Sequence, residues 1–568
     1  MSGVLEFFGW LLDAARHAAG ALRRLLPTPS PEVVRLRLDG SLAEGLPATP
    51  WFGLRFERRS YLLHVLELLD RASRDPRVRA VWIEPTGLRA GWATLQALRR
   101  GILDVRAKGK KVLVFLESAG NGVTYLASAA DRVLMAPSGT MSLTGLRTEI
   151  LFLRGTLDRA RVEPEFLQLG EYKSSAETLT RSSLSPPARE ALNAILDDLY
   201  DQIVSGIAEG RGLGPARVRE FIDAAPHLAA QAVAHGLIDA ARYEDEVEAD
   251  LRVLLGATER PPSVVEARHY LRAARRLPPP PGTNLQCPRI ALLIAQGMIR
   301  SGRVQPSPMR RGVASGTFVD ALRKARDDRR IAAIVIRVNS PGGSSLASDL
   351  IWREVTLARE KKPVVVSMGD VAASGGYYLS MPADWIVAEG ATLTGSIGVV
   401  AGKFNLRGLY DLLGIAKEAL DRGAHAGAQS DYRPFTTEER AKLQEQMRSV
   451  YEDFVEKAAK GRGLDREKLD RVAQGRVWTG RQALAHGLVD ELGGIQTAVA
   501  AAKRRAGIPF GQPVRMMVLP RPVPSFADLL PSSPLPRGLV DALDVAEALQ
   551  SFHALEPLVL WPFLLLSS

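Results

Sequence analysis

The sequence of 568 residues contains a single cysteine, Cys287, so no disulfide can form within the chain. It also lacks any apolar run of about 20 residues, the length that a helix needs to cross a bilayer. The apolar segment 4–17 near the N-terminus is interrupted by charged side chains and does not follow the basic-then-apolar order of a signal peptide. We therefore expect neither internal disulfides nor a transmembrane helix.

Metal and nucleic-acid chemistry also have little support. The eight histidines form no His-Glu-x-x-His pattern, and a single cysteine excludes Cys-x-x-Cys. The net charge of +11 is spread among acidic residues instead of being gathered into dense Lys/Arg runs. We predict no metal, no cofactor and no nucleic-acid partner.

Two apolar segments near the ends favour contact with a membrane surface. Leu5, Phe8 and Leu12 recur at helical spacing, which predicts an amphipathic helix that lies in a membrane interface or packs on the protein. The C-terminal stretch 558–566 is apolar but too short to span, and Pro562 interrupts it, so it either docks on the protein or touches lipid. We therefore expect the protein to associate with a membrane, without an assignment of the side.

The chain contains a long internal repeat. At an offset of 253 residues, Tyr125–Val133 matches Tyr378–Ile386 without a gap, and further on Gln231–Asp239 matches Gln482–Asp490 at an offset of 251. Self-similarity over about 250 residues indicates a duplicated domain, because solenoid repeats are far shorter.

Both halves alternate short, continuously apolar strands with helical segments. Residues 110–116 and 331–336 are examples of such strands, and this pattern is typical of a buried parallel sheet. We predict an α/β fold of two tandem duplicated domains with parallel-sheet βα units and helical extensions. The predicted divisions are an N-terminal helix with a proline-rich linker (1–32), a first domain (33–255), a linker (256–287), a second domain (288–508) and a tail (509–568).

Three turns of small residues in the second half suggest acyl-transfer chemistry. Asn339-Ser-Pro-Gly-Gly-Ser follows a predicted strand, and such a turn can point free N–H groups into a cleft, as an oxyanion hole requires. Ser374, in Ala372-Ala-Ser-Gly-Gly, follows the next strand with an uncrowded hydroxyl that suits a nucleophile. Thr394-Gly-Ser-Ile-Gly-Val is a third such turn. One turn alone is more often structural, but three together favour a catalytic site.

A serine nucleophile needs a base, and the first half offers Lys173 in Gly170-Glu-Tyr-Lys-Ser-Ser. Burial can lower the pKa of a lysine enough for it to act as a base. The repeat aligns Ser374 with Asn121 and Lys173 with Ala426, so neither half contains both residues. His425, next to Ala426, is the rival base. We therefore expect the two halves to pack together at the site.

The strings around Asn339, Asp370, Thr394 and Gly170 resemble those of the signal peptide peptidase A (protease IV) family, long bacterial form, over about residues 33–505. The resemblance implies tandem ClpP/crotonase-like domains and a Ser/Lys dyad. It implies roles for these residues: Ser374 as nucleophile, Lys173 as general base, Gly342, Gly343 and Gly375 as oxyanion donors, and Ser396 as the residue that orients the lysine. It also implies peptide substrates, namely signal peptide remnants at the inner membrane of a bacterial cell, and a homotetramer.

Two alternatives share the predicted fold. A crotonase-type acyl-CoA enzyme would use the glycine-rich turns without needing Lys173 and Ser374 together. A non-catalytic scaffold would have no reason to keep either residue. A serine peptidase accounts for both residues.

Overall fold

The structure is a computed structural model that describes residues 31–45, 60–256, 260–276, 287–303, 312–509, 511–520 and 558–560. The predicted N-terminal amphipathic helix, the proline run at 278–281 and most of the predicted tail lie outside these residues. Within the described ranges, no helix is both long enough and apolar enough to cross a membrane.

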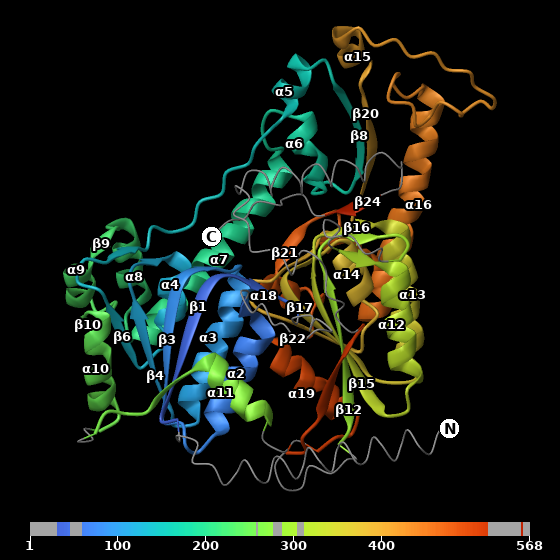
Figure 1. The fold of residues 1–568 in the computed structure, drawn as a ribbon. Coiled ribbons are helices and arrows are strands. Elements are labelled where there is room, and N and C mark those ends of the chain that lie inside the picture. The colour runs from blue at the N-terminus through green and yellow to red at the C-terminus, as the bar shows by residue number, and fades with distance from the viewer. Residues whose placement is uncertain are drawn as a thin grey trace.

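Each half of the chain builds its own sheet, parallel throughout in the first half and parallel except for β21 in the second (Figure 1). The first sheet has the central order β10-β6-β4-β3-β1-β11, and the second has the order β21-β19-β17-β15-β12-β23. Their strands are β1 (Val33–Ala43), β3 (Ala80–Arg89), β4 (Lys111–Leu116), β6 (Arg132–Met135), β10 (Ala240–Ala241) and β11 (Val264–Glu266), then β12 (Arg289–Gln296), β15 (Ile331–Ser340), β17 (Val364–Ala373), β19 (Leu393–Gly395), β21 (Val477–Thr479) and β23 (Arg515–Leu519). The predicted duplication of parallel βα units is therefore present.

The two sheets share one apolar core because helices of both halves lie between them. Helices α2 (Leu62–Arg74) and α3 (Trp92–Ala107) cover the first sheet, and α19 (Ile495–Arg505) packs on β15 and β17 of the second. Their buried side chains form one cluster that includes Leu69, Leu98, Val335 and Ala498. Helices α12 (Ser315–Asp327) and α13 (Ser345–Arg359) cover the other face of the second sheet.

The predicted domain boundaries stay predictions, and the sheets draw strands from both sides of them. Strand β11 comes from the segment predicted as a linker and pairs with β1, while β23 comes from the predicted tail and pairs with β12. These two strands form by pairing with the edge of a sheet. Their apolar stretches are too short to predict a strand from the sequence alone.

A long helix follows the core of each half. Helices α7 (Pro186–Arg211) and α16 (Thr437–Arg462) are both 26 residues long, as duplication predicts. Each begins after a hydroxyl N-cap and ends at a left-handed glycine, which satisfies backbone groups at both ends (Ser185 and Gly212, Thr436 and Gly463).

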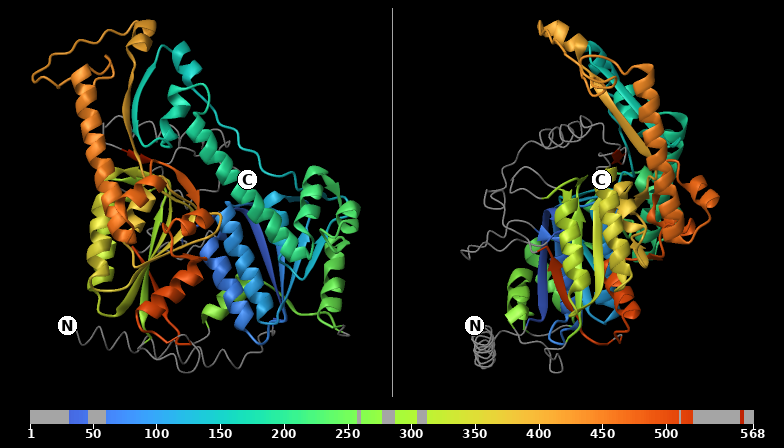
Figure 2. Two further views of the ribbon diagram at one scale, coloured as in Figure 1. Left: turned by 180° about the vertical axis from the view of Figure 1, so that it is seen from behind. Right: turned by 90° about the vertical axis from the view of Figure 1, so that its right-hand side faces the viewer.

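An arm formed by both halves projects beyond the two sheets (Figure 2). Strand β8 (Glu163–Leu169) of the first half pairs antiparallel with β20 (Val399–Asn405) of the second over seven residue pairs. Short helices α5 (Arg154–Arg159) and α15 (Arg407–Leu413) flank these strands. Lys173 lies four residues beyond the end of β8, so this pairing carries the lysine of one half to the other.

Candidate active site

Ser374 lies between β17 and α14 (Gly375–Ser380), at the sharp turn predicted from the small residues around it. Its φ of 56° is in the left-handed region that side chains rarely adopt, and strain of this kind gathers at functional sites. The backbone holds the turn, because the Ser374 N–H donates to Gly395 O at 2.8 Å and its carbonyl accepts from Tyr378 N at 2.8 Å. The side chain is fully buried.

Lys173 meets Ser374 across the boundary between the halves. Its Nζ lies 2.8 Å from Ser374 Oγ, although the two residues are 201 positions apart. The same Nζ lies 3.0 Å from Ser396 Oγ and 3.0 Å from Ser396 O. The structure thus brings together three of the residues singled out in the sequence.

The amine of Lys173 is fully buried, and burial holds its pKa well below the usual value for lysine. Desolvation disfavours the ammonium form, because a charge loses more hydration energy than a neutral amine does. A lysine in this state holds a free lone pair nearer neutral pH, which is what a general base requires.

Two glycines make room for the lysine side chain. A Cβ on Gly475, whose φ is +78°, would lie 2.5 Å from Lys173 Cβ, and a Cβ on Gly398 would lie 3.0 Å from Lys173 Cδ. Gly475 was not singled out in the sequence. The signal was available, because the repeat has Ala224 at the corresponding place, just as it has Ala426 in place of Lys173.

The three predicted oxyanion glycines lie beside the nucleophile. Gly342 and Gly343, with φ of +107° and +151°, begin β16 (Gly342–Ser344). A Cβ on Gly375 would lie 3.1 Å from Gly342 Cα and 3.2 Å from Gly343 N, so the two turns touch. Gly375 is the first residue of α14, where N–H groups have no partner within the helix. The N–H of Gly342 donates to Ser340 Oγ at 3.2 Å, leaving those of Gly343 and Gly375 as the better candidates.

The corresponding positions in the repeat carry neither a hydroxyl nor an amine. Asn121, the equivalent of Ser374, donates from Nδ2 to Gly145 O at 2.7 Å and accepts from Gly145 N at 3.2 Å. Ala426, the equivalent of Lys173, has no functional group. These two positions therefore supply no second Ser/Lys pair.

His425, the rival base, lies elsewhere. Its Nε2 is 3.5 Å from Glu438 Oε1, and its ring lines a cavity of about 810 Å³ bounded also by Leu346, Tyr378 and Phe435. The hydroxyl of Ser374 is instead in contact with Lys173. The geometry favours Lys173. Within the described part of the chain, no cluster of three or more His, Cys, Asp or Glu side chains could hold a metal ion.

Buried polar pairs near the nucleophile join the two halves. Glu44 accepts two hydrogen bonds from Arg337, at 2.7 and 3.0 Å, with both side chains almost wholly buried. Asp370, four residues before Ser374, accepts from Thr94 N at 2.9 Å and Thr94 Oγ1 at 2.7 Å. Burial raises the pKa of the Asp370 carboxyl, while the hydrogen bonds from Thr94 oppose that change.

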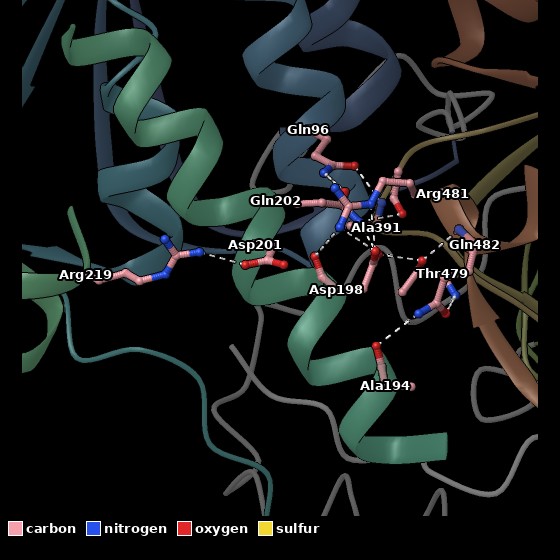
Figure 3. A network of polar contacts seen from close by, with 11 residues as sticks. Gln96, Ala194, Asp198, Asp201, Gln202, Arg219, Ala391, Thr479, Arg481 and Gln482 are labelled. Atoms are coloured by element: carbon pink, nitrogen blue, oxygen red, sulfur yellow. Dashed lines mark hydrogen bonds and ion pairs between the residues drawn. The ribbon is translucent and has the colours of Figure 1, made fainter. Parts of the chain in front are cut away.

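A second polar network lies between α7 and the strand–helix turn after β21 (Figure 3). Asp198 of α7 accepts from Thr479 Oγ1 at 2.6 Å and from Arg481 Nε at 2.7 Å. Gln482 Nε2 donates to Ala194 O at 3.0 Å. These contacts, none of which was predicted, fix the first half against the turn after β21, the strand that follows Gly475.

Comparison with known proteins agrees with this geometry. The model of peptidase family S49 matches residues 104–258 and 356–509, once in each half. The serine protease SPPA, chloroplastic, of Arabidopsis thaliana is 34% identical over 531 residues, covering 91% of this chain and 77% of that protein. Protease 4 of Salmonella typhi is 31% identical over 467 residues, covering 80% and 74%. Protease 4 of Haemophilus influenzae is 29% identical over 524 residues, covering 89% and 84%.

The two family matches confirm the resemblance seen in the sequence and the tandem duplication that it implied. They do not favour an acyl-CoA enzyme or a scaffold. The chain is a serine peptidase and belongs to peptidase family S49.

Proposed function

We propose that the protein is an endopeptidase that uses Ser374 as nucleophile and Lys173 as general base. The observation that supports this assignment is the 2.8 Å contact between Lys173 Nζ and Ser374 Oγ in a fully buried setting. A surface lysine would be protonated at neutral pH, but this one is held towards the neutral form.

The contacts of Lys173 suit a neutral amine, which has two N–H donors and one lone pair. The Ser396 carbonyl can only accept, so Nζ donates to it, and the second N–H donates to Ser396 Oγ. The lone pair then faces Ser374 Oγ and takes its proton. Ser396 is thus the positioning residue that turns the lone pair towards the nucleophile.

The reaction follows from these positions. As Ser374 Oγ bonds to the peptide carbonyl carbon, its proton moves to Lys173 Nζ, and the carbonyl oxygen becomes an oxyanion. Backbone N–H groups of Gly343 and Gly375, with Gly342 beside them, hold that oxyanion. The lysine ammonium then protonates the departing amine as the C–N bond breaks. Water, deprotonated by the neutral lysine, releases the acyl group.

We propose apolar peptides at a membrane surface, including signal peptide remnants, as the substrates. The similarity to a protein of Enterococcus faecium named putative signal peptide peptidase SppA, 36% identical over 190 residues, supports this class, and so does the apolar character of the predicted terminal segments. Anchoring would come from surface contact by those segments.

The dyad is tested by Ser374→Ala and Lys173→Ala, assayed on an apolar peptide with a fluorogenic leaving group. We expect Lys173→Ala to lose about 10²–10⁴-fold in kcat, the usual contribution of a general base, and Ser374→Ala to lose at least as much. Matched controls are Ser380→Ala, a buried serine on α14, and Lys403→Met, a buried lysine on β20, which should keep their activity. Full activity in either dyad variant would overturn the assignment.

We also propose that the homotetramer forms through the arms. At the same offset of 253, Leu153-Arg154-Gly155 matches Leu406-Arg407-Gly408, so each half carries an arm with one short helix (α5 or α15) and one strand (β8 or β20). Within the chain, the first strand of the second arm (β20) pairs with the second strand of the first arm (β8). The repeat equivalents of β20 and β8 are residues 146–152 and 416–422, and neither of these two segments pairs with another strand in the described part of the chain.

These two segments expose the apolar side chains that the internal pairing buries. Leu167 and Phe404 are each 8% exposed, whereas their repeat equivalents, Leu420 and Leu151, are 86% and 70% exposed. Exposed apolar residues whose counterparts are buried in a strand pair favour the same pairing between copies. Segment 146–152 of one copy would then pair with 416–422 of the next, head to tail.

A further inference from the structure

A third strand lies between the two elements that carry the dyad. The sheet order β14-β13-β16-β24-β20-β8 places β24 (Leu558–Leu560) between β16, which begins with the oxyanion glycines, and β20, which pairs with the strand leading to Lys173. Strand β24 is antiparallel to β16, with Leu560 opposite Gly342 and Leu558 opposite Ser344, and Leu558 also faces Val400 of β20. The C-terminal segment thus fills a gap that is one strand wide.

Such a gap is the form of a peptide-binding groove. Two strands separated by the width of one missing strand present backbone donors and acceptors to the space between them. An extended peptide can therefore bind there through its main chain whatever its sequence. A peptidase with varied substrates needs recognition of this kind.

The direction of β24 is that of a substrate. Strand β16 starts at Gly342, which lies against Gly375 beside the nucleophile, and it runs away from Ser374. An antiparallel partner therefore runs towards Ser374, and its last residue, Leu560, lies opposite Gly342. A peptide bound in this way pairs its acyl side with β16 and leads its next peptide bonds to the dyad.

The chemistry of the segment also fits the proposed substrates. From Leu558 to Leu566 the sequence is Leu-Val-Leu-Trp-Pro-Phe-Leu-Leu-Leu, with no charged residue. Because the segment belongs to the same chain, its effective concentration at the groove is on the order of 1 mM.

We propose that the C-terminal segment around Leu558–Leu560 is an internal ligand of the peptide groove, which every substrate must displace. The inference rests on the proposed peptidase site, and it adds that the chain restrains its own activity by competition. An internal ligand whose effective concentration is about tenfold above its dissociation constant for the groove raises the apparent KM about tenfold.

The test compares the full chain with a chain that ends at residue 557. The truncated enzyme should show a KM about tenfold lower with kcat unchanged, since internal competition acts only on binding. Val559→Pro in the full chain should have the same effect, because proline removes the N–H of the residue opposite Gly343. Leu565→Pro, which changes the tail beyond β24, is the matched control and should leave KM unchanged.

A binding measurement separates this inference from the proposed catalysis. In the Ser374→Ala background, a fluorescent peptide of sequence 555–566 should bind the truncated chain about tenfold more tightly than the full chain. Equal binding to both chains would overturn the internal ligand even if the enzyme is fully active. Absence of cleavage by both the full and the truncated chain with Ser374 intact, together with tenfold different binding, would overturn the proposed peptidase activity and keep the internal ligand.

Discussion

The pair of Ser374 and Lys173 depends on nearby glycines, which have no side chain, as much as on the residues that react. Gly475 and Gly398 leave the space in which Lys173 is stripped of water, and that loss of water lowers its pKa. Ser374 and Lys173 could be predicted because each lies in a distinctive local string that its repeat has lost. Gly475 was overlooked although its repeat has Ala224, because its role, to avoid a clash with a residue from the other half, shows only once the halves are packed together.

The value of kcat/KM should rise with pH as Lys173 loses its proton. Only the neutral amine accepts the proton of Ser374, and burial lowers the pKa of this lysine well below its usual value. We therefore expect kcat/KM to be lost as the pH falls through that lowered pKa and to be constant above it, up to the usual range of lysine. The measurement is kcat/KM against pH from 5 to 10. A limb centred near pH 10.5, the value of an exposed lysine, would contradict a buried base.

The same pKa has a consequence for stability. A group whose pKa is lower in the folded state destabilises the fold as the pH falls through the interval between the unfolded value and the folded one. Lys173→Met removes this dependence. The melting temperature of the variant should therefore rise relative to the wild type as the pH is lowered from about 10.5. An unchanged difference across that range would show that the lysine is charged in the folded protein.

At the scale of elements, the halves are held by polar contacts that flank the apolar core. Helix α7 crosses from the first half to the turn after β21, and Asp198 is the acceptor at that contact (Figure 3). The helix itself was predictable from its periodicity and its serine cap. Its partner was not, because a buried carboxylate on a helix of mixed polarity looks like any solvated one in the sequence.

Asp198→Ala should destabilise the joined halves by about 2–4 kcal/mol, because it leaves the buried hydroxyl of Thr479 without its acceptor and Arg481 without its charge partner. Asp201→Ala, on the same helix, is the matched control. Asp201 pairs with Arg219 at 2.9 Å, but both side chains are about half exposed, so the loss should be within about 0.5 kcal/mol. Urea unfolding measures both. Equal losses would mean that the contact in Figure 3 does not hold the halves together.

At the scale of the whole molecule, duplication gives each half an arm, and one segment of each arm, β8 or β20, pairs with the other arm within the chain. The repeat was evident in the sequence, and it correctly implied two sheets and an interface between them. The exchange of β8 and β20 between halves was not predictable, because strand pairing across such a distance depends on how the two domains pack. The exposed leucines at 151 and 420 become interpretable only once their buried counterparts are known.

The arm pairing between copies has a defined register, which cysteine cross-linking can test. Ala401 faces Leu167 in the internal pair, so Thr148 of one copy should face Leu420 of the next. The sole cysteine, Cys287, is first changed to serine. Mixing a Thr148→Cys chain with a Leu420→Cys chain under oxidation should give a covalent heterodimer on a non-reducing gel.

The control for this experiment replaces Leu420→Cys by Asp421→Cys, because a shift of one residue turns a side chain to the opposite face of a strand. It should cross-link far less. Equal cross-linking of both mixtures would contradict the register, and no cross-linking in either would contradict head-to-tail assembly through the arms.

The separation of Lys173 from Ser374 along the chain also orders events during synthesis. The two residues are 201 positions apart, so at about 5–20 residues per second the lysine leaves the ribosome roughly 10–40 s before the serine does. Throughout that interval the growing polypeptide has a base but no nucleophile, and it cannot cut unfolded neighbours. Strand β24 emerges later still, after both strands that border the groove, so the segment that competes with substrates is the last part of the site to be made.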